Sequence, residues 1–284
     1  MTQESKLTLA SFLVSKRVKG LIEKGKRIDG RALNEFRELT IEPNVISIAD
    51  GSAKVTLGST VIVAGINFGL DHPFPDTPNM GMLFTEGEIL PTASLRARPG
   101  PPSERAIELS RVVDRGVRES KMLPMEEMVL EPGERVLKVN VDFSILADSG
   151  NLIDAASLAA VAALSTSTWP DPDELRKKTG IAVEEVSRTK LPLRDLPVAV
   201  TVADLFGQLV SDPSSEEELV LNSRLTVTHT KDDVICAMQK GGRQGLTTDQ
   251  IHEAVGMAEE KSKELRQFLI DAVGGVTLAK KEKS

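Results

Sequence analysis

The chain has 284 residues, of which 40% are hydrophobic and 27% are charged. These values exclude a collagen, a coiled coil and a disordered chain, and the length suffices for one large domain or two modest ones. Acidic side chains number 42 against 35 of lysine and arginine, and the net charge of −7 argues against a nucleic-acid binder that relies on bulk charge. A local basic stripe is compatible with that charge.

Several other functional classes are disfavoured by composition. Cys236 is the only cysteine and the three histidines lie far apart, so we expect neither a disulfide nor a metal site, and no cofactor. With no tyrosine and one tryptophan, stacking of bases on aromatic side chains is not expected to carry any RNA binding. No apolar run approaches the ~20 residues of a membrane helix, and the N-terminus lacks a signal-peptide pattern, which favours a cytoplasmic protein.

The first quarter of the chain predicts a helix followed by strands. Residues 7–23 carry apolar side chains every three or four positions, which indicates an opening helix. Residues 53–57 alternate with period two, and 61–66 form a continuous apolar run typical of a strand buried on both faces. The short turn at 58–60 between them predicts a hairpin.

Two proline-rich segments, 71–80 and 98–102, predict loops. Ser103 then offers an N-cap for a helix that runs to about Glu119. The apolar face of this helix consists of Leu109, Val112 and Val113.

The middle of the chain predicts a strand at 136–146 and an alanine-rich helix at 152–164, whose small side chains permit close backbone approach. Prolines and charges in 165–194 predict a boundary, and strand pairs are expected at 196–210 and 225–239.

The last predicted element is an amphipathic helix. Thr247, with Gln250 three residues later, forms a capping box, and the helix is expected to end before Gly274. The tail 280–284 is charged and expected to fray. The order of elements indicates an α+β fold and is compatible with two copies of a similar half, although the sequence contains no convincing repeat with a fixed period.

Three arginines form the first candidate site. Arg111, Arg115 and Arg118 share one side of a helix, opposite its apolar face. The planar fork of arginine suits phosphate recognition, because it donates two parallel hydrogen bonds. The alternative is a solvent-exposed face on which Glu108 pairs with Arg111, and Asp114 with Arg111 and Arg118.

A second candidate is the small-residue turn 148–152, which leads into the alanine-rich helix. The free N–H groups of a helix N-terminus can hold a phosphate. This turn contains no cation, however, and Asp154 places a carboxylate in the first helical turn, where it would repel a phosphate. The pattern favours a capped helix start.

The third candidate is the acidic segment 212–218, followed by Asn222, Ser223 and Arg224. A carboxylate cluster after a strand can bind Mg²⁺ or serve in acid–base catalysis. Consecutive acids on a polar connection more often form a solvated turn, which we favour here. The glycine-rich segment 241–245 lacks the strand–loop–helix spacing of a nucleotide motif.

Four segments in this order resemble the ribonuclease PH superfamily, and the resemblance spans residues 26 to 273. The four segments are 27–31, 51–60, 98–102 and 106–118. Within the superfamily, residues 106–115 and 151–160 most resemble the non-catalytic ring subunit of the archaeal RNA exosome.

The resemblance implies a fold of two similar βαβ-containing halves with mixed sheets and packed helices. It implies an alternating hexameric ring with a catalytic paralogue, which degrades single-stranded RNA from the 3′ end with inorganic phosphate, and RNA-binding cap proteins on the ring. No membrane association is implied. The implied division is an N-terminal helix at 1–25, a first half at 26–170, a linker at 171–194, a second half at 195–275 and a flexible tail at 276–284.

The resemblance also bears on catalysis. Catalytic relatives hold phosphate in a Gly-Gly-Thr/Ser-Arg turn, where this sequence has Leu152 in place of the arginine. A catalytic aspartate of those relatives falls at or near Ser223, beside Asn222, and neither residue can ionise as a carboxylate. The resemblance therefore implies a subunit without catalytic residues.

Arg111 and Arg115 match the family's arginines that hold RNA phosphates beside the partner's active site, and Arg118 is the third candidate. The main alternative is that the chain is itself an active phosphorolytic exoribonuclease or nucleotidyltransferase, against which Leu152 and Asp154 argue. We also consider a eukaryotic ring subunit and an unrelated α+β metabolic domain.

Overall fold

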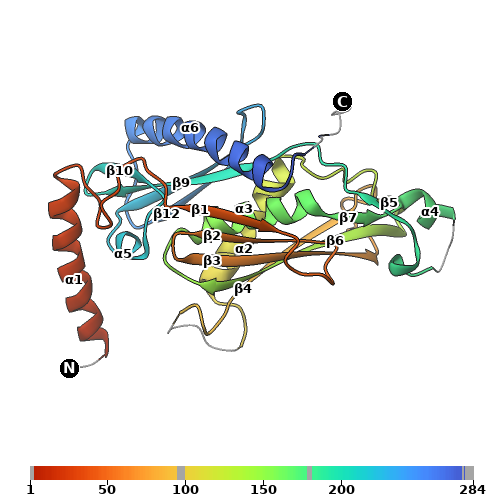
Figure 1. The fold of residues 1–284 in the computed structure, drawn as a ribbon, viewed down its shortest axis with the longest axis horizontal. Coiled ribbons are helices and arrows are strands. Elements are labelled where there is room, and N and C mark those ends of the chain that lie inside the picture. The colour runs from red at the N-terminus through yellow and green to blue at the C-terminus, as the bar shows by residue number, and fades with distance from the viewer. Residues whose placement is uncertain (1–2, 95–99, 178–180, 277, 279–284) are drawn as a thin grey trace.

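A computed structural model describes residues 3–94, 100–177, 181–276 and 278, with side chains of the first helix described from Phe12 onward. Its first sheet lies within residues 39–147 (Figure 1). The strands of this sheet are β1 (Leu39–Pro43), β2 (Gly51–Leu57), β3 (Thr60–Asp71), β4 (Met82–Ile89), β5 (Val129–Glu131) and β6 (Arg135–Ala147).

The first sheet is mixed, with the strand order β1-β2-β3-β6-β4 and β5 paired to β6. Neighbours from β1 to β6 are antiparallel, whereas β4 runs parallel to β6. The connection from β4 to β6 contains α2 (Glu104–Glu119), so this half contains the expected βαβ unit.

The second sheet is antiparallel throughout its described strands, in the order β10-β9-β11-β12. Mixed pairing is therefore a property of the first sheet. The strands of the second sheet are β9 (Val198–Leu205), β10 (Gln208–Ser211), β11 (Ser223–His229) and β12 (Ile235–Gly242). A four-residue helix, α5 (Ser215–Glu218), lies between β10 and β11.

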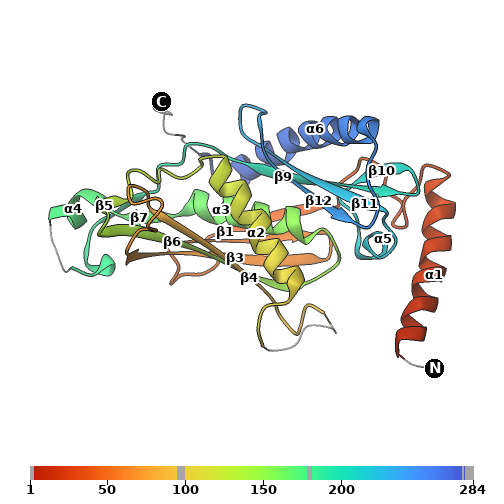
Figure 2. The ribbon, with the colours of Figure 1, turned by 180° about the vertical axis from the view of Figure 1, so that it is seen from behind.

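The helix α3 (Leu152–Thr166) joins the two sheets, because it packs against β2 and β3 on one side and against β9 on the other. Every residue from 152 to 165 is buried, and α2 packs beside α3 (Figure 2). Gly51 permits the close approach, since a Cβ at this position would lie 2.6 Å from the Ala163 carbonyl oxygen. One continuous apolar core includes residues of both sheets.

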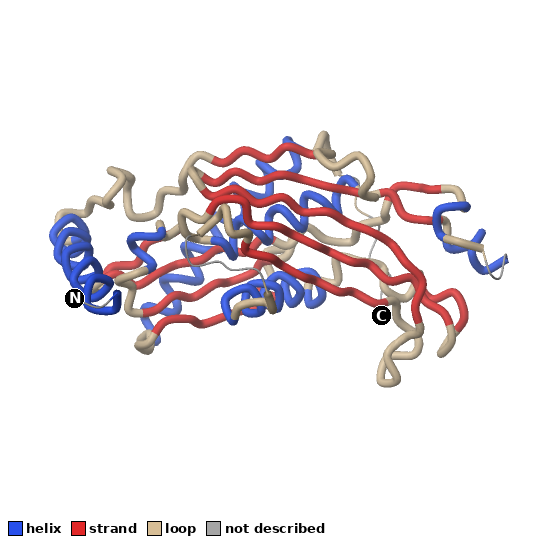
Figure 3. Tube along the Cα trace, turned by 90° about the horizontal axis from the view of Figure 1, so that it is seen from below, coloured by secondary structure: helices blue, strands red, loops and turns tan. Residues whose placement is uncertain are grey.

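Two further helices belong to the second sheet's side of the molecule. The first, α1 (Gln3–Ile22), stands at the end of the molecule in Figure 3, and its Val18 and Ile22 pack against Val210 of β10. The last, α6 (Thr248–Ala272), packs on β9 and β11. The capping box predicted at Thr247 and Gln250 is confirmed, with both reciprocal hydrogen bonds present.

The segment that separates the two sheets in sequence carries short elements of its own. It contains β7 (Thr168–Pro170), α4 (Pro172–Lys177), a 3₁₀ turn η1 (Val183–Glu185) and β8 (Arg188–Lys190), which pairs with β7. Leu175, Val183 and Leu193 of this segment are buried in the common core.

The predicted hairpin of 53–57 and 61–66 is confirmed by the antiparallel pairing of β2 and β3. The expectation that 61–66 is buried on both faces is wrong, because its residues alternate between buried and half-buried positions. Arg98 and Pro99 of the predicted loop lie outside the described residues, as do 279–284 of the predicted tail. Val276 and Leu278 are partly buried and pack against the core.

Candidate functional site

The arginine face of α2 is oriented by the helix cap and by the packing of its opposite side. Ser103 is the N-cap, and its side chain accepts a hydrogen bond of 3.2 Å from the Ala106 N–H. Burial of the apolar face turns the three predicted arginines outward: Arg111 and Arg118 are exposed, and Arg115 is half-buried.

The three arginines differ in their partners. Arg118 donates to the Asp114 carboxylate at 2.9 and 3.0 Å, as the exposed-face alternative predicts. Arg115 donates from Nη1 to the side-chain oxygen of Gln239 on β12 at 3.2 Å. Within the described part of the chain, no hydrogen bond or ion pair engages Arg111.

The predicted pairing of Glu108 with Arg111 is wrong. Glu108 accepts instead from Arg224 of β11 at 2.8 Å, because the second sheet approaches this side of α2. Arg111 therefore presents a guanidinium without a counter-ion among the described residues. A hollow of about 340 Å³ runs along this face, and its lining consists of all three arginines, Ser110, Thr85 and the acidic side chains of Asp114 and Glu119.

The acidic segment 212–218 is not a solvated turn, and that expectation is wrong. Asp212 and Glu217 are fully buried. Arg27, itself buried, donates to Glu217 at 2.9 and 2.5 Å, and to the backbone carbonyls of Ser211 and Asp212. The sequence segment that begins at Arg27 thus supplies the counter-ion that a buried carboxylate requires.

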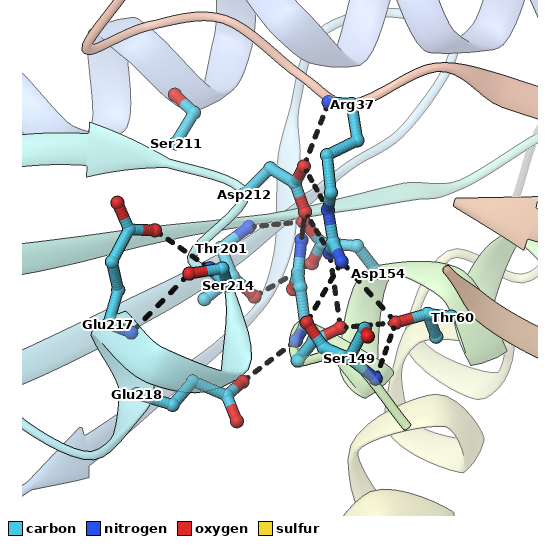
Figure 4. Close-up of polar contacts among 12 residues, drawn as sticks. Arg37, Thr60, Ser149, Asp154, Thr201, Ser211, Asp212, Ser214, Glu217 and Glu218 are labelled. Carbon is cyan, nitrogen blue, oxygen red and sulfur yellow. Dashed lines mark hydrogen bonds and ion pairs between the residues drawn. The ribbon is translucent and has the colours of Figure 1, made fainter. Parts of the chain in front are cut away.

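Asp212 is the centre of a second set of contacts, of which Figure 4 shows those with Arg37. Its carboxylate accepts from Arg31 at 2.9 Å, from Arg37 at 2.6 and 2.8 Å, and from the side-chain amide of Asn151 at 2.8 Å. Both carboxylate oxygens are occupied by donors from this chain. The group is consequently unavailable as a ligand for Mg²⁺ in this arrangement.

The N-terminus of α3 is also occupied by a group of the chain itself. Asn151 is the N-cap residue, but it adopts a left-handed conformation (φ 53°) and its side chain makes no cap hydrogen bond. Its backbone N–H donates to a carboxylate oxygen of Glu218 at 2.8 Å. Glu218 also pairs with Arg105, at 3.2 Å.

The prediction of a capped helix start is therefore correct in position, but the capping anion is Glu218. The expectation that the turn lacks a cation holds only for the local sequence. Arg37 donates to the carbonyls of Ser149 and Gly150 at 3.0 and 3.1 Å. Gly150 is required there, since a Cβ would lie 2.4 Å from the Ser215 nitrogen.

Asp154 faces the second sheet and not the open end of α3. Its carboxylate is fully buried and accepts from the Thr201 N–H at 2.9 Å, the Thr201 hydroxyl at 2.7 Å and the Asn151 amide at 2.8 Å. Burial raises the pKa of Asp154 to about 7, while these hydrogen bonds oppose the rise.

The positions compared with the catalytic aspartate offer no free carboxylate. Ser223 is buried and its hydroxyl has no partner, while Asn222 donates to Asp204 at 3.1 Å. The glycine-rich segment ends β12, where Gly241 lies against the Arg224 side chain. Across the described ranges, no group of three or more His, Cys, Asp or Glu side chains could hold a metal ion.

The sequence interpretation missed the buried ion pairs of Asp212 and Glu217. It also missed the contact of Glu218 with α3 and that of Gln239 with Arg115. Ser214 and Glu217 have the spacing of a capping box, and both of its hydrogen bonds form at α5. That spacing was a signal that Glu217 has a fixed position. No local pattern signals the contact of Glu218 with α3 or that of Gln239 with Arg115, because each joins segments far apart in sequence.

A two-part fold of this kind, with the first half built on a mixed sheet, is that of the 3′ exoribonuclease (RNase PH) family, to which the chain belongs. Domain 1 of this family matches residues 35–170, and domain 2 matches residues 195–261. The resemblance to the ribonuclease PH superfamily is thereby confirmed.

The proteins similar to this chain include archaeal exosome components. The chain is 40% identical to the exosome complex component Rrp42 of Thermococcus gammatolerans over 273 residues, which is 96% of this chain and 100% of that protein. It is 46% identical to the Rrp42 component of Thermoplasma acidophilum, over 86% of this chain and 90% of the relative.

A solved structure described as the Archaeoglobus fulgidus exosome with RNA bound to the active site contains a chain with a TM-score of 0.84 and 40% identity. The match covers 92% of this chain and 99% of that chain. Among the helices in the described part of the chain, none is long and apolar enough to cross a membrane.

Proposed function

We propose that the chain is a non-catalytic subunit of an archaeal exosome ring that degrades RNA from the 3′ end with inorganic phosphate. In the proposed assembly it alternates with a catalytic paralogue in a hexameric ring, next to RNA-binding cap proteins, in the cytoplasm. The similarity to Rrp42 components and to a chain of an RNA-bound archaeal exosome supports membership of such a complex.

One observation carries the proposed RNA contact: Arg111 has no counter-ion among the described residues and lies beside Arg115 and Arg118 along one hollow of α2. A guanidinium without a carboxylate partner keeps its full charge for a phosphate. Arg118 is the weaker candidate, since Asp114 already offsets its charge. Contacts of this kind position an RNA strand without reading its sequence.

The contacts at α3 support the proposal that this subunit is catalytically silent. The sequence resemblance implies that catalytic relatives hold phosphate at the N-terminus of the corresponding helix. Here the Asn151 N–H is taken by the Glu218 carboxylate, and Asp154 lies in the same helical turn. A phosphate at this position would have to displace the Glu218 carboxylate, whereas the Asp154 carboxylate is buried against the second sheet.

The isolated chain is therefore expected to show no phosphate-dependent RNA decay, and a mixture with the catalytic paralogue is expected to show decay and the mass of a ring. The measurements are phosphorolysis of a labelled RNA and sedimentation of the mixture. Decay by the chain alone, abolished by Asp204→Asn or Asp212→Asn, would favour the alternative of an active exoribonuclease. Failure to associate with the paralogue at micromolar concentration would contradict the ring.

A further inference from the structure

Arg115 is the one arginine of the α2 face that the second sheet holds. Its Nη1 donates to the Gln239 side-chain oxygen at 3.2 Å and to the Met238 backbone carbonyl at a longer distance of 3.5 Å. We propose that Gln239 is a positioning residue, which orients the Arg115 guanidinium toward an RNA phosphate. This inference rests on the proposed function, and it assigns to the second half of the chain a role in the RNA contact.

The frame that carries this contact is the packing of α2 along the second sheet. Glu108 pairs with Arg224 at 2.8 Å, and eight residues further along α2, Gly116 lies against Thr228, four residues further along β11. Eight helical residues rise about 12 Å and four strand residues about 13 Å, so α2 and β11 advance by nearly the same distance between the two contacts. Gln239 of β12 lies between these contacts, since it pairs with Thr226 of β11.

The chemistry of the acceptor distinguishes Arg115 from its neighbour. Asp114 holds Arg118 by an ion pair, which fixes the guanidinium and also offsets its charge. Gln239 carries a neutral amide, which accepts a hydrogen bond without adding a negative charge beside Arg115. No carboxylate pairs with Arg115 among the described residues.

Positioning of this kind favours binding because a long, flexible side chain loses rotamer freedom when it contacts a ligand. A side chain that is already oriented loses less, and the affinity rises without a new contact to the RNA. One Nη1 bond to Gln239 also leaves Arg115 with further N–H donors, since a guanidinium has five. The arrangement thus combines an ordered guanidinium with free donors and a charge that no ion pair among the described residues offsets.

The test measures RNA affinity of the assembled ring at two salt concentrations for Gln239→Ala, Gln239→Glu, Arg115→Ala and the double variant Gln239→Ala with Arg115→Ala. Gln239→Ala removes one hydrogen bond and is expected to weaken RNA binding about threefold to tenfold, with an unchanged salt dependence because the charge remains. Gln239→Glu keeps a hydrogen-bond acceptor, but its carboxylate would form an ion pair with Arg115 and offset the positive charge. Weaker RNA binding and a shallower salt dependence are therefore expected.

The double variant is expected to bind no more weakly than Arg115→Ala, because Gln239 acts only through that arginine. Gln267→Ala on α6 is the matched control, since it also removes an amide side chain that makes one hydrogen bond, to Asp271. Gln239→Met retains the side-chain length without an acceptor, and it replaces Gln239→Ala if the latter fails to fold.

The outcomes separate this inference from the proposed function. If Arg115→Ala weakens RNA binding while Gln239→Ala and Gln239→Met bind like the wild type, the positioning role is wrong and the proposed function stands. If Arg115→Ala itself leaves the affinity unchanged in an intact ring, the proposed contact of Arg115 fails, and the inference fails with it. Additive losses in the double variant would also overturn the inference, since Gln239 would then act independently.

Discussion

At the scale of single residues, charge compensation distinguishes buried structure from candidate ligand contacts. Arg27 is buried, and its guanidinium donates hydrogen bonds to the Glu217 carboxylate and to the backbone carbonyls of Ser211 and Asp212. Arg111 lies exposed on α2 with no such partner in the described chain. Exposure and the lack of a counter-ion, more than residue type, mark Arg111 as available to a phosphate.

Loss of Arg27 is expected to destabilise the protein, because it leaves the buried Glu217 carboxylate without its counter-ion. Arg27→Met should lower the free energy of unfolding by about 3–5 kcal/mol, and the double variant Arg27→Met with Glu217→Leu should recover much of that loss. Urea denaturation of both variants measures the difference. Lys54→Met is the control, because Lys54 and Glu42 form a partly exposed pair, whose loss is expected to cost at most about 1 kcal/mol. Equal losses for Arg27→Met and Lys54→Met would contradict a buried pair.

Asp154 gives a pH dependence with a defined direction. Its folded pKa of about 7 lies above the value of about 3.9 expected in the unfolded chain. The folded protein therefore binds more protons between these values, and the contribution of Asp154 to stability falls as the pH rises from about 4 to about 7. The melting temperature of Asp154→Asn relative to the wild type should accordingly increase from about pH 5 to about pH 8. A difference that is constant over this range would show that Asp154 does not titrate there.

At the scale of elements, the alanine-rich sequence of α3 allows two sheets to approach one helix. Gly51 of β2 is a point of close approach, because a Cβ there would meet the Ala163 carbonyl oxygen and the Ser167 side chain. Close packing of this kind leaves no room for an added methyl group unless backbone moves.

Gly51→Ala is therefore expected to destabilise the protein by about 1–3 kcal/mol, as overpacking typically does. Gly20→Ala within α1 is the matched control, since nothing lies within 4 Å of its Cβ position and alanine favours a helix by about 0.5–1 kcal/mol over glycine. Thermal unfolding of both variants checks the contrast. A neutral effect of Gly51→Ala would mean that the contact between β2 and α3 is looser than the structure has it.

The elements themselves follow from local sequence signals to a large extent. Ser103, Thr247 and the alanine-rich run predict the positions of α2, α6 and α3, because caps and periodicity act within a few residues. The burial of Asp212 and Glu217 could not be predicted in this way, since a row of acids looks solvent-exposed until the distant arginines that neutralise it are placed in space.

The same limit applies to the candidate site. Helical spacing predicts that Arg111, Arg115 and Arg118 share one side of α2, and the structure places them along one hollow. Their partners depend on tertiary packing, because β11 draws Glu108 away from Arg111 and β12 brings Gln239 to Arg115. The sequence predicts that the three arginines share one face of α2, but it does not predict which of them has a partner within the chain.

At the scale of the whole molecule, one apolar core connects the two sheets through α3. We propose the division into an N-terminal helix (1–25), two halves (26–170 and 195–275), a connecting segment (171–194) and a tail (276–284), with the family's two domain matches as support. The shared core implies that the halves unfold together. A single transition in calorimetry, with equal calorimetric and van't Hoff enthalpies, is the expected result. Two separate transitions would show that the halves are independent.

The most direct test of the proposed role is the RNA affinity of the assembled ring that carries Arg111→Ala and Arg115→Ala. Each charged hydrogen bond to a phosphate contributes about 1.5–3 kcal/mol, so the loss of both arginines should weaken binding at least about a hundredfold. The loss should be similar for all RNA sequences and the salt dependence shallower, with little change in melting temperature. Lys261→Ala with Lys263→Ala on α6 removes the same charge elsewhere and should leave the affinity near that of the wild type. An unchanged affinity of the arginine variant in an intact ring would contradict the RNA-binding role proposed for this chain.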